Sequence, residues 1–424
     1  MPAASGAFPI GESATIAQLT EDPHPVLARL RAREPVSWLP ALGGWLVTRR
    51  DLAEQVLRDP DGFTVDDPRF TTARVVGPSM LSLDGSEHRR HRDPFAHALR
   101  RGDISAGLAV FTASEADRLV AALAGAGSPE AGSSEAGAGR AELRRGLAGP
   151  LAVAVMTEVL GLAGTDPAVL LAWYDAIVAG VSALTAANAP ADGGSVVSRA
   201  AADGGQVPAA AVSAFGELRA SLVAAIERPG ASSLLAVAAQ TAGLAVGEVV
   251  SNAAVMLFGG IETTEGMICN AVRHLLASPD QVHDLDADRS LLDGAVDESL
   301  RLEPAAAVVD RYATAGARLG EADVSGGDLV VVSLAGANRD PAVFPEPDRF
   351  DIRRPNARQN LGFALGPHFC VGAQLARMET REAVTALLDR LPGLRLDPEQ
   401  LAAPHGLVFR KPPALHVRWD ASAA

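Results

Sequence analysis

The run Phe363-Ala364-Leu365-Gly366-Pro367-His368-Phe369-Cys370-Val371-Gly372 contains one of only two cysteines in this chain of 424 residues. Gly366-Pro367 indicates a tight turn, and apolar residues recur at helical spacing from Val371 onward, so Cys370 should lie at or just before a helix start. Unpaired N–H groups and the helix dipole lower the pKa of a thiol there and favour the thiolate that binds metals. A buried structural cysteine is the alternative for an isolated residue.

The composition predicts a soluble globular protein with a large core, since 48% of the residues are hydrophobic and 21% are charged. No linker divides the chain convincingly, so we expect residues 1–424 to form a single domain. The longest apolar run falls short of the ~20 residues that span a bilayer, and the N-terminus lacks a signal pattern, which predicts a cytoplasmic protein without a membrane partner. A net charge of −14 argues against nucleic-acid binding.

Most periodic segments are helical, which predicts a mainly α protein with small β-sheets. Strands are expected at residues 44–48 and 329–333, and a strand pair at residues 407–409 and 415–419. Two segments rich in small residues, about 124–139 and 187–206, are expected to be mobile surface loops.

A helix is predicted from about residue 249 to residue 277, and its stretch 253–258 is apolar on every face, so it should cross the core. Gly259-Gly260-Ile261-Glu262-Thr263-Thr264 then breaks several helix preferences at once. A glycine pair can loosen the backbone ladder, and a threonine hydroxyl can take up a freed carbonyl, which leaves a pocket beside the helix. The alternative is a helix that ends at the two glycines and restarts.

The pattern Phe-x-x-Gly-x-His-x-Cys-x-Gly at residues 363–372 resembles the haem-binding loop of the cytochrome P450 family. Further motifs of the family occur in its usual order, from about residue 81 to 419: His88-x-x-x-Arg92, Gly-Gly-x-Glu-Thr-Thr, Glu298-x-x-Arg301 and Asn338-Arg339-Asp340-Pro341. The resemblance implies a triangular single-domain fold, with haem b between a helix at about 247–277 and a helix at about 371–390. Ala364 stands where the family usually has glycine, which is mild at negative φ and strained at positive φ.

The resemblance also implies a role for each matching residue. Cys370 is the thiolate ligand of the haem iron, Thr263 hydrogen-bonds dioxygen or its water, and Glu262 relays protons from solvent. Glu265 is expected to face solvent or to support Glu262. The remaining assignments are propionate binding by His88, Arg92, Arg311 and His368, a buried structural set of Glu298, Arg301 and Arg349, and a substrate pocket bordered by Gly259, Val308, Val309 and Val408.

The implied activity is monooxygenation of an apolar organic substrate by O2, as hydroxylation or a related oxidation in natural-product tailoring or xenobiotic metabolism. Electrons would come from NAD(P)H through a ferredoxin reductase and a ferredoxin, because the chain carries no fused flavin or iron–sulfur segment. The ferredoxin would dock on a basic patch of Arg89, Arg90, Arg100, Arg101, Arg377 and Arg381.

Two groups of alternatives stay open. The same scaffold could perform oxidative coupling, O-dealkylation or peroxide-driven oxidation, although the acid–alcohol pair Glu262-Thr263 argues against peroxide, which brings its oxygens already protonated. A haem sensor or carrier without turnover is the alternative from a different class.

Overall fold

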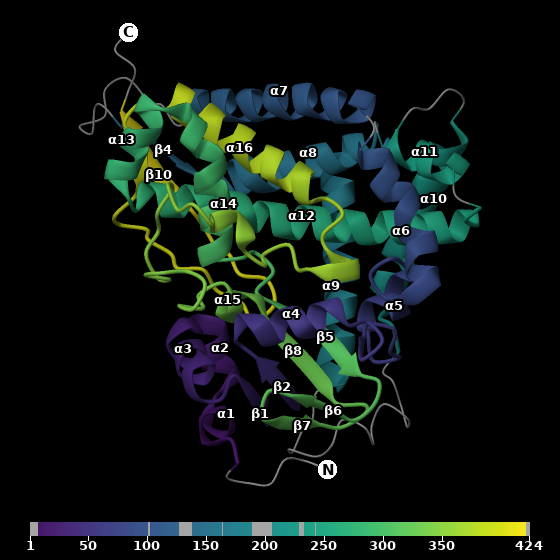
Figure 1. Ribbon diagram of the computed structural model, residues 1–424. Coiled ribbons are helices and arrows are strands. Elements are labelled where there is room, and N and C mark those ends of the chain that lie inside the picture. Colours follow the sequence, from purple (N-terminus) through teal and green to yellow (C-terminus); the bar gives the residue numbers. More distant parts are fainter. Residues whose placement is uncertain are drawn as a thin grey trace.

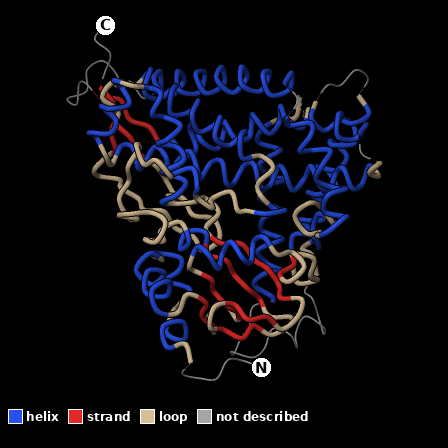
Figure 2. Tube along the Cα trace, in the orientation of Figure 1, coloured by secondary structure: helices blue, strands red, loops and turns tan. Residues whose placement is uncertain are grey.

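The computed structural model describes residues 7–100, 102–126, 138–162, 164–188, 206–228, 233–241 and 243–420. Figure 1 shows a wedge with a wide helical layer at one end and a sheet at the narrow end, and Figure 2 shows a second group of strands at the edge of the helical layer. The two expected surface loops lie largely outside the described residues. The helices run α1 Pro9–Ser13, α2 Ile16–Glu21, α3 His24–Arg33, α4 Arg50–Arg58, α5 Thr71–Val76, α6 Gly85–Arg100, α7 Gly102–Ala126, α8 Gly149–Leu160, α9 Pro167–Asn188, α10 Ala209–Glu227, α11 Leu234–Thr241, α12 Val246–Leu276, α13 Pro279–Ala287, α14 Leu292–Leu302, α15 Leu334–Ala337 and α16 Ala373–Arg390.

Helix α12 is the axis of the helical layer and packs against α8, α10, α14 and α16 (Figure 1). It is continuous over 31 residues, so the alternative of a break at the glycine pair is wrong. Gly260 lies close to α8, because a Cβ there would lie 2.4 Å from the sulfur of Met156 and that side chain would have to move. The mainly helical fold with small sheets is confirmed.

The strands form one larger and two small sheets. The five-stranded sheet has the order β1-β2-β8-β5-β3, in which only β2 and β8 run parallel. The smaller sheets have the orders β4-β10-β9 and β6-β7. The strands are β1 Val36–Leu39, β2 Gly44–Val47, β3 Phe63–Thr64, β4 Ala138–Glu142, β5 Val308–Ala313, β6 Ala317–Leu319, β7 Ala322–Val324, β8 Leu329–Ser333, β9 Arg395–Leu396 and β10 His416–Asp420.

The two faces of the five-stranded sheet pack against different partners because side chains alternate along a strand. Trp45, Val330 and Val332 join a core with α4, whereas Leu46 and Val331 join a core with α1, α2 and α3. A third and larger core fills the helical layer around α12. The side chains of β5 alternate in the same way, with Val309 against the α4 core and Val308 against the core of α1, α2 and α3.

The strand pair expected at residues 407–409 and 415–419 does not form. Residues 416–420 are the central strand of the β4-β10-β9 sheet, whereas Phe409 makes an isolated bridge to Ala306. Local alternation indicated a strand near the C-terminus but could not identify partners from distant parts of the chain.

Of the described helices, α10 is long and apolar enough to cross a membrane. It packs against α9, α11 and α12, and a helix inside a globular protein meets the same criteria.

Candidate functional site

The cysteine loop is fixed by close backbone contacts. Gly366 has φ +75° and lies so near α4 that a Cβ would come within 2.3 Å of the Leu57 carbonyl oxygen. The backbone N–H of Cys370 donates to the Phe363 carbonyl oxygen at 2.9 Å, which closes the loop. Helix α16 begins three residues later, at Ala373, so Cys370 lies just before a helix N-terminus as expected.

Ala364 has φ +57°, so it occupies the left-handed region that favours glycine. The sequence left open whether alanine at this position is mild or strained, and the positive φ shows that it is strained. A non-glycine residue costs about 1–2 kcal/mol in this conformation. The surrounding loop must hold this residue in place.

Cys370 keeps accessible surface, although the surrounding protein partly desolvates its thiol. Burial raises the pKa of this thiol, while the Gly372 N–H and the charges of Arg92 and Arg377 act in the opposite direction. The prediction that the pKa of the Cys370 thiol is lowered is thus wrong for the free thiol. A coordinated metal ion deprotonates a thiol outright, so metal binding does not require a low intrinsic pKa.

Four residues that the sequence assigned to one anionic group come together beside this loop. The rings of His88 and His368 lie 4.2 Å apart, and Arg92 donates to the Phe369 carbonyl oxygen at 2.5 Å. The charge of Arg311 acts on His368, which places this buried arginine in the same cluster. We call His88, Arg92, Arg311 and His368 the cationic cluster.

Asp84, an acid that was not assigned to the site from the sequence, contacts the cationic cluster. His368 Nε2 lies 2.8 Å from Asp84 Oδ1, and this contact helps to lower the pKa of Asp84 to about 2 against the opposing effect of burial. Burial lowers the pKa of His88 to about 4, and its Nε2 has no hydrogen-bond partner among the described residues. The signal for Asp84 was present, because it lies four residues before His88.

These residues fit a haem. The donor set offers one cysteine that keeps accessible surface, with an orphaned buried imidazole and two guanidinium groups close by. The buried nitrogen of His88, the buried Arg311 and the half-buried Arg92 have no ion pair with a carboxylate of the described residues, and the propionates of haem would supply acceptors. Cys370 would hold the iron, and the cationic cluster would hold the propionates.

The middle of α12 borders open space although the helix runs through the core. Residues 258–260, 262 and 263 keep accessible surface, and a Cβ on Gly259 would meet no described atom within 4 Å. Thr263 Oγ1 donates to the Gly259 carbonyl oxygen at 2.5 Å, which is the hydroxyl-to-carbonyl contact expected for a loosened helix. The Gly259–Thr263 turn therefore faces open space that a ligand could occupy.

Glu262 is held by two residues from distant segments. Its Oε1 lies 2.7 Å from Lys411 Nζ, and Tyr174 donates its hydroxyl to Oε2 at 2.5 Å. Burial raises the pKa of Glu262, but Lys411 and Tyr174 outweigh it, so the net shift is downward. Burial and the charge of Glu262 raise the pKa of Tyr174. Glu262 is consequently an ionised carboxylate at neutral pH.

Lys411 is the only lysine in the sequence, and it joins two acids of α12. Its Nζ also lies 3.0 Å from Glu265 Oε1, and Glu265 in turn accepts from Arg144 in a π-helical turn, Arg144–Ala148. Glu265 is mostly buried, so it supports this network and does not face solvent. A single lysine among so many arginines was the sequence signal that could have drawn attention to residue 411.

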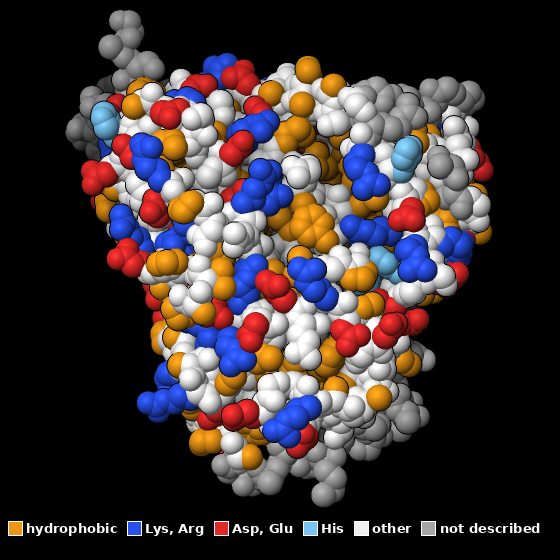
Figure 3. Space-filling model, in the orientation of Figure 1, with side chains coloured by type: hydrophobic (Ala, Val, Ile, Leu, Met, Phe, Trp, Pro, Cys, Tyr) orange, Lys and Arg blue, Asp and Glu red, His pale blue; other side chains and the backbone are white. Residues whose placement is uncertain are grey.

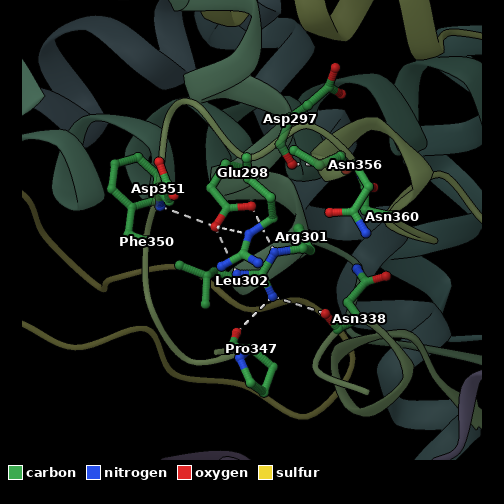
Figure 4. A network of polar contacts seen from close by, with 12 residues as sticks. Asp297, Glu298, Arg301, Leu302, Asn338, Pro347, Phe350, Asp351, Asn356 and Asn360 are labelled. Atoms are coloured by element: carbon green, nitrogen blue, oxygen red, sulfur yellow. Dashed lines mark hydrogen bonds and ion pairs between the residues drawn. The ribbon is translucent and has the colours of Figure 1, made fainter. Parts of the chain in front are cut away.

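The pair Glu298–Arg301 is completely buried, and Figure 4 shows both side chains facing each other within a ring of loop residues. Arg301 Nε donates to Glu298 Oε2 at 2.7 Å, and its other nitrogens donate to backbone carbonyls of Asn338, Pro347 and Arg349. The pair therefore joins α14 to the loop that precedes the cysteine.

Arg349 does not complete the buried structural set as expected. Its side chain is exposed and pairs with Glu346, while the guanidinium that reaches Glu298 belongs to Arg354, at 2.9 Å. Both arginines lie in the same loop, and only its folded path brings the later one inward. Arg349 contributes a backbone carbonyl oxygen alone.

The four residues assigned to the substrate pocket do not line one space. Val309 packs against the same core as Ala364 and Leu365 of the cysteine loop, whereas Val308 points to the opposite face of the sheet. Val308 and Val408 border a cavity with residues of α2 and α3, and Gly259 is not among its lining residues. The ring of Phe409, the residue after Val408, lies 6.0 Å from that of Phe258 on α12.

The expected basic patch is largely neutralised. Arg90 pairs with Glu87 and Glu248, Arg377 with Asp297, and Arg381 with Glu382. Arg101 lies outside the described residues.

Comparison with known proteins agrees with this geometry. The family model described as Cytochrome P450 matches residues 210–399. The chain is 35% identical to cytochrome P450 monooxygenase PikC of Streptomyces venezuelae, over 94% of this chain and 91% of that protein. It is 32% identical to nocardicin C N-oxygenase of Nocardia uniformis subsp. tsuyamanensis, over 97% and 98%. The crystal structure of CalO2 superposes with a TM-score of 0.79 at 28% identity, covering 95% of this chain and 97% of that chain.

The fold and the cysteine site thus define a haem-thiolate class of protein. The chain belongs to the cytochrome P450 family, whose relatives are named as monooxygenases, and it is an oxidoreductase of this family.

Proposed function

We propose that the chain inserts one atom of O2 into an apolar organic substrate and reduces the other atom to water. The observation that carries the proposal is the accessible surface that Cys370 keeps beside the cationic cluster. A haem b held by Cys370 and by His88, Arg92, Arg311 and His368 would supply the activation of O2.

The residues of α12 would handle protons. Glu262 is ionised by Lys411 and keeps accessible surface, so it can accept a proton from solvent and release it toward the open space beside α12. Thr263 can turn its hydroxyl from the Gly259 carbonyl toward an acceptor in that space. This acid–alcohol pair favours O2 with external electrons over peroxide, because O2 must gain protons during its reduction.

The electrons would come from NAD(P)H through a ferredoxin reductase and a ferredoxin in the cytoplasm. Figure 3 shows the face that carries α6 and α16, where basic and acidic side chains surround an apolar hollow. Phe369, 40% exposed, offers an apolar contact next to Cys370. With much of the basic patch paired, we expect a docking surface that depends on apolar contact as much as on charge.

The substrate would be a natural product or a comparable apolar molecule. Relatives with names that state a reaction include nocardicin C N-oxygenase and the vitamin D(3) 25-hydroxylase of Pseudonocardia autotrophica, which is 31% identical over 89% of this chain. Hydroxylation is the reaction that the second of these names states, and the neighbouring rings of Phe258 and Phe409 favour an apolar substrate.

The test is turnover with labelled oxygen. The purified protein, a ferredoxin, its reductase and NADPH are incubated with apolar compounds first selected by the change that binding causes in the haem spectrum. We expect product with one atom from labelled O2, and we expect Thr263→Ala to consume NADPH with less product and more hydrogen peroxide. Product labelled from water, or equal product yield in the variant, contradicts the assignment.

A further inference from the structure

A cavity of about 230 Å³ lies on the face of the five-stranded sheet that is turned away from α4. It is enclosed by the sheet, by α2 and α3, and by the segment after residue 406, at the narrow end of the molecule (Figure 1). Its wall is predominantly apolar, with Leu19, Leu27, Leu46, Val308, Val331 and Val408. Apolar cavities of about 150 Å³ bind benzene, so this space accepts a larger apolar group.

Asp310 places a carboxylate in this apolar wall. It follows Val308 by two residues on β5 and lies opposite Val331 of β8, so strand alternation turns its side chain to the same face as theirs. The side chain of Asp310 is exposed, and it is among the residues that line the cavity. A leucine or valine would suit this position if the cavity had only a packing role.

The carboxylate of Asp310 has no hydrogen bond or ion pair with any described residue. The neighbouring Arg311 turns to the other face of β5 and donates to the Asp310 backbone oxygen at 2.7 Å. Arg410 also lines the cavity but is already bound, since it pairs with Glu303 at 2.8 Å and donates to backbone carbonyls. The cavity thus holds one unsatisfied negative group.

A carboxylate in an apolar wall without a protein partner is stabilised by neutralisation or by a cation that enters the cavity. Burial raises the pKa of Asp310, and Arg311 only partly opposes this effect. An ammonium group on an apolar body would supply the missing charge at the carboxylate and fill the apolar space. Anionic and strongly polar ligands would be rejected by the same features.

We propose that this cavity binds an apolar molecule with one amine, whose ammonium group pairs with Asp310. The cavity lies on the face of the sheet opposite Val309 and the cysteine loop, so the amine is a second ligand and not the molecule that is oxidised. Asp310 is the residue that selects the amine.

The test compares two molecules of the same shape, 1-aminoadamantane and 1-adamantanol, by calorimetric titration of the full haem-loaded protein. We expect the amine to bind at least about tenfold more tightly than the alcohol, because a desolvated charge pair is lost with the alcohol. Asp310→Asn should remove this difference, whereas Asp323→Asn, an exposed acid on β7, should preserve it. Val308→Phe, which fills the cavity, should weaken both ligands.

Equal affinity of the two molecules for the unchanged protein overturns the proposal, and so does an amine preference that survives Asp310→Asn. The haem spectrum in the same titration shows whether the amine nitrogen binds iron instead, which also overturns it. The reduced carbon monoxide spectrum of each sample keeps the two hypotheses apart. A normal thiolate spectrum without amine preference rejects this inference alone, whereas loss of the thiolate spectrum in the unchanged protein rejects the proposed function.

Discussion

Replacing Lys411 by methionine removes the one cation that joins the two acids of α12. Lys411 Nζ lies 2.7 Å from Glu262 Oε1 and 3.0 Å from Glu265 Oε1, so these oxygens are less than about 6 Å apart. At an effective dielectric constant of about 20, the attraction between two opposite charges about 4 Å apart is worth about 4 kcal/mol, and Lys411→Met removes it from Glu262. That energy corresponds to a roughly thousandfold higher proton affinity of Glu262, and the remaining repulsion from Glu265 then has no cation to offset it.

The direction in which Lys411→Met shifts the pH profile follows from the ionisation state of Glu262 in the unchanged enzyme. Lys411 and Tyr174 now lower its pKa against burial, so the carboxylate is ionised at neutral pH and takes up a permanent proton only on acidification. In Lys411→Met the pKa rises, and protonation begins at higher pH. A permanently protonated Glu262 cannot accept the next proton from solvent, so product formed per NADPH should decline at a higher pH than in the unchanged enzyme.

The assay is product yield per NADPH as a function of pH, and two variants separate charge from packing. Lys411→Arg keeps the cation and should retain the original pH profile. Adding Glu265→Gln to Lys411→Met removes the repulsion and should move the profile back toward the original. If Lys411→Met and the unchanged enzyme show the same profile, the electrostatic account of Glu262 is refuted.

Three further predictions concern stability. Ala364→Gly should stabilise the protein by about 0.5–1 kcal/mol in chemical denaturation, because it relieves the positive φ at the smaller entropic cost of glycine, and destabilisation contradicts this. Arg354→Met should lower the free energy of unfolding by about 3–5 kcal/mol, because it leaves the buried Glu298 with one cation fewer. Arg349→Met should change the free energy of unfolding by less than about 0.5 kcal/mol, because that side chain is exposed. Equal effects of the two variants would show that the buried pair does not need Arg354. Burial lowers the pKa of His274 to about 3 from 6.5, so the folded state loses stability as the pH falls below about 6.5, by roughly 3 kcal/mol at pH 4.5. Denaturation of His274→Gln across this range should show a smaller loss, and an unchanged slope contradicts the burial argument.

The parts of the site that the sequence predicts are those encoded in contiguous residues. The turn and helix start around Cys370, and the irregular stretch from Gly259 to Thr264, need no long-range information, because glycine, proline and threonine act on the adjacent backbone. Even so, the sign of the pKa shift of Cys370 depends on burial by distant segments and could not be read locally.

Other features depend on where separate segments meet. Tyr174 and Lys411 reach Glu262 from α9 and from the segment before β10, and no periodicity links those positions. The choice of Arg354 over Arg349 depends on the path of one loop around Glu298. Val308 and Val309 were assigned to one pocket because β5 was not recognised as a strand, although alternation along a strand separates neighbouring side chains.

The reduced carbon monoxide difference spectrum of the unchanged protein and of Cys370→Ala tests the central claim most directly. The account predicts the Soret position of thiolate-ligated haem in the unchanged protein and its loss in Cys370→Ala. Cys269→Ala serves as the matched control, since the second cysteine is buried in α12 and should leave the spectrum as it is. A thiolate spectrum that persists in Cys370→Ala, or an imidazole spectrum in the unchanged protein, would contradict the account.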